Sequence, residues 1–204
     1  MRKFAISIIC LFGSLTMGAQ VVDTVDLPSL IANAEKGYDL SQCLLGAYYY
    51  NGKGVEQNYG EAVKWFRKAA DQGLADAQYH LGLCYENGQG VEKDLNEASK
   101  LYRKAAKQGN ANGAWKTGLC YVSGHGVRQN YRKAVKWLTK AAEQGHADAQ
   151  LDLGLLYAGG FGCSQNKAEA AKWISKADQQ GHPNAKKYLE KVMRSKKEEV
   201  RRKR

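Results

Sequence analysis

The chain has 204 residues and a formal net charge of +11, and most of this charge lies at one end. The segment from Lys186 to Arg204 holds ten basic and three acidic residues, a net charge of +7. The remainder is nearly balanced. The sequence therefore excludes a folded body that is basic throughout and confines the high isoelectric point to the tail.

Residues 1–19 have the composition of a secretory signal peptide. Two basic residues precede an apolar run from Phe4 to Met17, and the small residues Gly18 and Ala19 follow it. The run is shorter than the roughly 20 residues that a membrane-spanning helix needs. We therefore expect cleavage after residue 19 and export to a bacterial periplasm or the cell exterior, where a protein seldom meets nucleic acid.

From residue 39 the sequence repeats with a period of 36 residues. Five sets of positions recur at this step, which chance composition does not produce, and a fixed period of this length indicates a solenoid, a propeller or an array. We divide the region into four units at 39–73, 74–109, 110–145 and 146–181. The recurring positions are Gly46, Gly82, Gly118 and Gly154; Tyr49, Tyr85, Tyr121 and Tyr157; Ala62, Ala98, Ala134 and Ala170; the loop pairs Gly52/Gly54, Gly88/Gly90, Gly124/Gly126 and Gly160/Gly162; and Gly73, Gly109, Gly145 and Gly181.

Each unit is predicted to form two helices, which we name helix A and helix B. In the second unit, apolar residues from Ala75 to about Asn87 have helical spacing and form helix A. A Gly-x-Gly turn follows, Asp94 has the short polar side chain of an N-cap, and helix B runs to about Gln108 before the closing glycine. No segment alternates with a period of two residues, so the sequence predicts an all-α fold without a sheet.

A glycine recurs in the middle of helix A although it costs about 1 kcal/mol there relative to alanine. We interpret Gly82 and its equivalents as places where neighbouring helices approach closely. The predicted large partners form one column of helix B, namely Trp65, Leu101, Trp137 and Trp173.

Shorter segments flank the four units. Residues 20–38 contain a short lead and a predicted helix from Leu27 to Gly37, which aligns with a helix B and would cap the first unit. Residues 182–204 begin as a fifth helix A, with Pro183 at the N1 position, and then become strongly charged. This tail is compatible with binding to an anionic surface, such as lipid head groups, and equally with a solvated helix end.

The repeat resembles the Sel-one-like repeat family, relatives of the tetratricopeptide repeat with a longer loop. The likeness covers about residues 39–181 and implies a right-handed α-α superhelix that holds other proteins and has no shared catalytic residue. Units depart from the pattern at Leu101, Thr117, Cys163 and Asp178. In the second unit the residues that carry the resemblance are Ala75, Ala77, Leu81, Gly82, Tyr85, Gly88, Gly90, Val91, Asp94, Ala98, Lys104, Ala105, Ala106 and Gly109.

Four cysteines follow the predicted signal peptide: Cys43, Cys84, Cys120 and Cys163. An even number in an oxidising compartment is compatible with disulfides. Cys84 and Cys120 occupy equivalent positions in adjacent units, but packed helices lie about 8–10 Å apart, whereas a disulfide needs Cα atoms within about 7 Å. We therefore expect buried free thiols that fill the core as small apolar groups.

The sequence lacks the usual signatures of a metal site or a catalytic centre. Its four histidines, His80, His125, His146 and His182, do not have metal-ligand spacing. The Gly-x-Gly loops recur in every unit, which favours turns over a phosphate-binding loop. We expect no catalytic residue, no metal and no cofactor.

The remaining candidate site is the inner surface of the superhelix, which by resemblance is lined by helix A. Positions that vary between units while their neighbours stay fixed are free of a shared packing role. Two adjacent columns vary in this way, Cys43/Tyr79/Trp115/Leu151 and Leu44/His80/Lys116/Asp152. The alternative is that these residues only pack one helix A on the next. The predicted partner-binding residues are Tyr79, His80, Trp115, Lys116, Leu151 and Asp152, with Tyr79 and Trp115 as aromatic anchors.

These observations predict an exported, monomeric, non-enzymatic scaffold that binds a protein or peptide on its concave face. Two alternatives remain at this point. One is an envelope enzyme that acts on cell-wall or peptide substrates, and the other is a protein that binds anionic surfaces through its basic tail.

Overall fold

The computed structural model describes residues 26–202, so the signal peptide predicted at 1–19 lies outside the described residues. Between residues 26 and 202 all regular secondary structure is helical, which confirms the predicted all-α class. The helices are α1 (Leu27–Glu35), α2 (Asp39–Asn51), α3 (Tyr59–Asp71), α4 (Ala75–Asn87), α5 (Leu95–Lys107), α6 (Ala111–Ser123), α7 (Tyr131–Glu143), α8 (Ala147–Gly159), α9 (Lys167–Gln179) and α10 (Ala185–Arg202).

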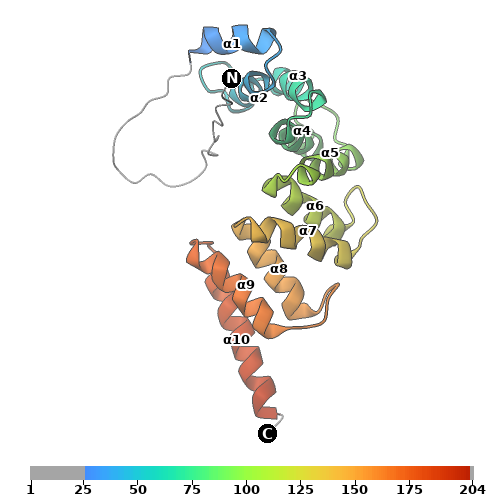
Figure 1. Ribbon diagram of the computed structural model, residues 1–204, viewed down its shortest axis with the longest axis vertical. Coiled ribbons are helices and arrows are strands. Elements are labelled where there is room, and N and C mark those ends of the chain that lie inside the picture. Colours follow the sequence, from blue (N-terminus) through green and yellow to red (C-terminus); the bar gives the residue numbers. More distant parts are fainter. Residues whose placement is uncertain (1–25, 203–204) are drawn as a thin grey trace, which may run out of the picture.

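The helices stack in chain order into a solenoid. Each packs mainly against the helix before it and the helix after it, and together they form a curved ribbon with α1 at one end and α10 at the other (Figure 1). Helices α2, α4, α6 and α8 are the predicted helices A, and α3, α5, α7 and α9 are the helices B. Helices α1 and α10 cover the outer units, as predicted for capping helices.

The helix limits follow the predicted capping residues. Asp94 Oδ1 accepts hydrogen bonds from the backbone N–H groups of Asn96 and Glu97, at 2.8 and 3.0 Å, at the start of α5. Gly88 ends α4 in the left-handed conformation with φ 72°. One boundary is wrong: α10 begins at Ala185 rather than at Pro183, because residues 183 and 184 form a turn before it.

The helix A glycines are points of close contact, as predicted. A Cβ atom added at Gly82 would lie 2.7 Å from Cε1 of Tyr102, and one added at Gly118 would lie 2.7 Å from Cγ of Leu138. The predicted partner column is wrong by one residue, since the contacting residues are Phe66, Tyr102, Leu138 and Ile174. One residue is a rotation of about 100° on a helix, so the column Trp65, Leu101, Trp137 and Trp173 lies beside this contact. The three indoles of that column are only partly buried, and each has a lysine ammonium over its ring.

The second glycine of the loop joins one unit to the next. A Cβ atom at Gly90 would overlap the backbone carbonyl of Tyr59 in the preceding unit, and one at Gly126 would overlap that of Leu95. Gly54, in the first unit, has nothing within 4 Å of the same position. These glycines therefore allow both a positive φ angle and a close approach between units.

Buried glutamines form hydrogen bonds across most of the joints between units, and we call this set of bonds the glutamine ladder. Gln78 Nε2 donates to the carbonyl of Ala70 at the end of the preceding helix B, at 3.3 Å, and Gln78 Oε1 accepts from Gln108 at 2.8 Å. Gln42 and Gln150 repeat this arrangement in the first and fourth units. The third unit has Ala114 at the equivalent position, so the joint between α5 and α6 lacks the ladder.

Candidate partner-binding surface

The inner face of the arc is built from one side of each helix A. In α4, Leu81 is buried in the core. Asp76, His80, Leu83 and Asn87 follow one another at intervals of 4, 3 and 4 residues, so they share one side of the helix. The equivalent residues of α2, α6, α8 and α10 continue this surface along the solenoid.

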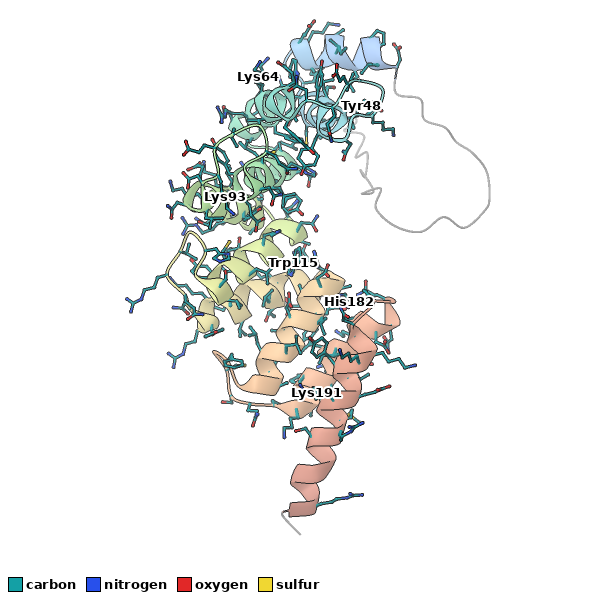
Figure 2. All side chains as sticks on the ribbon, turned by 180° about the vertical axis from the view of Figure 1, so that it is seen from behind. Tyr48, Lys64, Lys93, Trp115, His182 and Lys191 are labelled. Carbon is teal, nitrogen blue, oxygen red and sulfur yellow. The ribbon has the colours of Figure 1, made fainter. Side chains whose placement is uncertain are left out.

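The side-chain view shows the two surfaces of the arc. Trp115 and His182 lie on the inner side of the bend, whereas Lys64 and Lys93 lie on the outer side (Figure 2). Lys64 and Lys93 belong to the helix B and loop regions, so helix A forms the concave lining that the family resemblance implies.

Trp115 connects two units rather than standing free. Its Nε1–H donates to Asp152 Oδ2 at 2.8 Å, and its ring lies 4.9 Å from the ring of His146. Burial raises the pKa of the Asp152 carboxyl, although the hydrogen bond from Trp115 opposes this shift. The predicted residues Trp115 and Asp152 are thus in direct contact and form one polar cluster across α6 and α8.

Lys116 forms a second cluster with Glu86 and Tyr102. The Lys116 ammonium lies 2.8 Å from Glu86 Oε2, and the Tyr102 hydroxyl donates to the same oxygen at 2.5 Å. Burial raises the pKa of Glu86, but the hydrogen bonds from Lys116 and Tyr102 outweigh it and lower the pKa overall. Glu86 is therefore held as a carboxylate that links the second and third units.

Tyr79 and His80 pack against aromatic residues of the first two units. The imidazole of His80 stacks on Phe66 with ring centroids 5.2 Å apart, and Tyr79 touches its edge at the same distance. Tyr79 also lies 6.0 Å from the ring of Tyr102. Burial lowers the pKa of His80 although Asp76 opposes the shift, so the ring is neutral at pH 7.

The six predicted residues therefore do not form one site. Trp115 and Asp152 are in contact, Lys116 pairs with Glu86, and Tyr79 and His80 form an aromatic group. Leu151 is 6% exposed and belongs to the apolar cluster below α10. The contacts Trp115–Asp152, Lys116–Glu86 and His80–Phe66 join neighbouring units, so packing between units accounts for much of the two predicted columns.

Sequence reasoning missed the row of aliphatic residues on the inner face. Leu83, Leu119 and Leu155 occupy equivalent positions and are only partly buried, and Ala47 continues the row in α2. Leu40 and Leu44, on the same side of α2, are 47% and 38% exposed. The near-identity of this row was visible in the sequence, but a constant apolar column is normally taken as core.

The cysteines differ in burial, and the structure has all four as free thiols. Cys84 and Cys120 are buried, as predicted, whereas Cys43 and Cys163 are only partly buried. Burial raises the pKa of Cys84 and Cys120 to about 11 and, with help from Asp76 and Asp39, that of Cys43 to about 12.

Two histidines flank one carboxylate at the edge of the inner face. His182 Nε2 lies 3.1 Å from Asp148 Oδ1, and His146 Nδ1 lies 3.8 Å from Asp148 Oδ2. No three His, Cys, Asp or Glu side chains within the described part of the chain are arranged to hold a metal ion. The Gly-x-Gly loops are turns, with positive φ at both glycines.

The basic tail continues α10 as a helix to Arg202. Exposed residues on it include Lys186, Lys191 and Arg194. None of the helices between residues 26 and 202 has the length and apolar character required to cross a membrane.

These features define a class of protein: an α-solenoid of helical hairpins whose inner face is an open apolar and polar surface. The Sel1 repeat model matches residues 39–74, 75–110, 111–146 and 147–182. The chain belongs to the Sel1 repeat family. Proteins of this family generally act as protein-interaction scaffolds rather than as enzymes.

Several solved structures are similar to the chain. A protective antigen of uropathogenic Escherichia coli strains, which displays an SLR fold, is 39% identical with a TM-score of 0.77, over 80% of this chain and 35% of that one. A Sel1 repeat protein from Oxalobacter formigenes is 38% identical with a TM-score of 0.76, over 80% of this chain and 65% of that one. Helicobacter pylori cysteine-rich protein B is 28% identical with a TM-score of 0.52, over 61% of this chain and 92% of that one.

The chain spans about a third of the length of the Escherichia coli antigen and 65% of the Oxalobacter protein. No protein with curated annotation matches the chain significantly. The comparisons therefore establish the family and the fold, and they carry no substrate or named partner.

Proposed function

We propose that the protein is an exported scaffold that binds a protein or peptide partner along the concave face of its solenoid. The observation that carries the proposal is the partly exposed aliphatic row Ala47, Leu83, Leu119 and Leu155, which runs through all four units. An apolar surface of this kind is an interaction surface when it is continuous and bordered by polar groups. Here the border is formed by Asp76, Asn112 and Asp148 on one side and by Asn51, Asn87 and Ser123 on the other.

The hydrogen-bonded clusters beside the row support the same proposal. The pairs Trp115–Asp152 and Lys116–Glu86 hold side chains in fixed positions on the inner face before any partner arrives. A preformed surface loses less side-chain entropy when it binds. Tyr79, His80, Trp115, Lys116 and Asp152 are therefore proposed to contribute at the margins of the contact, with Leu151 beneath it.

Export is proposed from the sequence of residues 1–19. The expected result is that the protein recovered from the cell envelope or the medium begins at or near Gln20. N-terminal sequencing that finds Met1 retained would remove this part of the proposal.

Site-specific photo-crosslinking tests the concave face directly. A photoreactive residue is placed at Asn87 or Ser123, which are exposed on the inner face, and in matched proteins at Lys64 or Lys93 on the outer face. We expect the same partner to be crosslinked from both inner positions in the native envelope and from neither outer position. Equal crosslinking from both faces, or crosslinking from the outer face alone, would contradict the proposal.

A further inference from the structure

The inner face ends in a cavity between α8 and α10. Its volume is about 260 Å³, and it is open to solvent on one side. Leu155, Ala158 and Val192 form an apolar floor, and the exposed Gly159 lies at the edge of the lining. Tyr188, Lys167, Lys191 and Ser195 form the rim.

The cavity exists because the residue at position 158 is small, whereas the ring of Phe161 occupies the space beside Gly159. The position of Ala158 is filled by Tyr50, Glu86 and Val122 in the first three units, and the position of Gly159 is filled by Asn51, Asn87 and Ser123. In those units Tyr50, Glu86 and Val122 contact the neighbouring unit, whereas Asn51, Asn87 and Ser123 are exposed. For example, the Tyr50 hydroxyl donates a hydrogen bond to Gln89 Oε1 at 2.6 Å, and Glu86 Oε2 forms an ion pair with the Lys116 ammonium at 2.8 Å. Only the fourth unit has alanine at this position.

Positive charge appears at the same place. Lys191 occupies the position of Leu83, Leu119 and Leu155 in the aliphatic row, and its side chain is exposed on α10 (Figure 2). Lys167 replaces the residue that is Tyr131 in the third unit, and its ammonium lies 3.5 Å from the carbonyl oxygen of Ser195, which keeps it at the rim. An apolar hollow with a cationic rim matches an apolar group that carries an adjacent negative charge.

We propose that this cavity binds the C-terminal residue of the partner peptide, with an apolar side chain on the floor and the terminal carboxylate beside Lys191. This inference rests on the proposed function, because it names the part of the partner that the concave face receives. The volume supports a single residue, since pockets for whole small molecules are larger, at roughly 300–1,000 Å³. The cavity also lies at the end of the aliphatic row, where a peptide that follows the row would reach α10.

The test uses the exported chain and fluorescein-labelled pentapeptides that end in Leu, Phe or Asp, each as the free acid and as the C-terminal amide. Ala158→Val and Ala158→Tyr introduce the residues of the third and first units, so both changes are compatible with the repeat. Lys191→Met removes the proposed charge, and Lys186→Met, an exposed lysine on the same helix, is its matched control. Circular dichroism verifies the fold of each variant.

We expect the Leu and Phe acids to bind and the Asp acid to bind at least tenfold more weakly. Filling the floor in Ala158→Tyr should weaken binding about 10- to 100-fold, because it removes the burial of one large apolar side chain. Amidation and Lys191→Met should each weaken binding roughly two- to fivefold, as for an exposed ion pair, whereas Lys186→Met should have no effect.

Three results would overturn the assignment: equal binding of acid and amide, equal binding by Ala158→Tyr and the natural chain, and tighter binding of laurate than of any peptide, which would identify a lipid ligand. Partner crosslinking from Asn87 distinguishes failure of the cavity assignment from failure of the scaffold proposal. If the natural chain and Ala158→Tyr capture the partner equally, the cavity assignment fails and the scaffold proposal stands. If the natural chain captures no partner, the scaffold proposal itself fails.

Discussion

Replacing Gly90 by alanine tests how consecutive units are joined. Gly54 and Gly90 are equivalent loop residues with φ angles of 72° and 71°, so alanine meets the same backbone strain at both positions. They differ in their surroundings, because a Cβ atom at Gly90 would overlap the carbonyl of Tyr59, whereas Gly54 has open space. The pair therefore separates the cost of the left-handed conformation from the cost of the close approach.

The expected magnitudes follow from these two terms. The left-handed conformation costs an alanine about 1–2 kcal/mol, and this is the whole effect expected at Gly54. At Gly90 the overlap involves backbone atoms, which cannot rotate away, and overpacking adds about 1–3 kcal/mol. For a chain of this size, 1 kcal/mol corresponds to about 2–4 °C in Tm. Gly90→Ala should therefore melt about 2–12 °C below Gly54→Ala.

Thermal unfolding followed by circular dichroism at 222 nm measures both variants against the natural chain. Gly54→Ala serves as the control for backbone strain, and identical far-ultraviolet spectra at low temperature verify that both variants fold. Equal melting temperatures for the two variants would show that the loop does not bear on the preceding helix B, and the account of the joints would be wrong.

Three further predictions follow from the core and the titrating groups. Gly82→Val should lower the free energy of unfolding by about 1–3 kcal/mol, because Tyr102 is fully buried and already touches Gly82; a neutral or stabilising result in thermal unfolding would contradict the close approach. Burial lowers the pKa of His80 below its usual 6.5, so the unfolded chain binds more protons than the folded chain and stability falls as the pH drops below about 6.5. The Tm of His80→Leu should therefore fall less than that of the natural chain between pH 7 and pH 5. Equal decreases in Tm would argue against a buried neutral ring. Iodoacetamide at pH 8 should alkylate Cys163 first, and Cys84 and Cys120 only after denaturation because they are buried, as read by mass spectrometry. Cys43 is partly buried, but its pKa of about 12 keeps it protonated at pH 8, so it should react more slowly than Cys163. Fewer than four alkylated thiols in denaturant would reveal a disulfide.

Most of the fold could be predicted because the residues that determine it recur at equivalent positions in all four units. The capping residue at Asp94, the loop glycines and the helix A glycine each have a local physical reason that one unit displays and the others repeat. The helix B residue that contacts Gly82 was predicted less accurately. Trp65 and Phe66 are adjacent and both large and apolar, and a rotation of about 100° decides which one faces helix A.

The inner face was harder to predict than the fold. Its contacts join residues about one period apart, such as Trp115 with Asp152 and Glu86 with Lys116, and they depend on the pitch of the superhelix, which the sequence pattern does not fix. Variation between units correctly singled out residues that are not part of the shared core. It overlooked the constant Leu83 row, because a residue can recur when it lines a groove as well as when it fills a core.

Because position 114 is alanine, the joints between units differ in the kind of contact that holds them. The joints on either side of it have hydrogen bonds between uncharged glutamine side chains, whereas the second and third units are linked by the hydrogen bond from Asn110 to Asp76 and by the half-buried ion pair between Lys116 of α6 and Glu86 of α4. An ion pair near the surface weakens as ionic strength rises. The link between the second and third units should therefore lose more stability at high salt than the links made by the glutamines, because only it includes an ion pair.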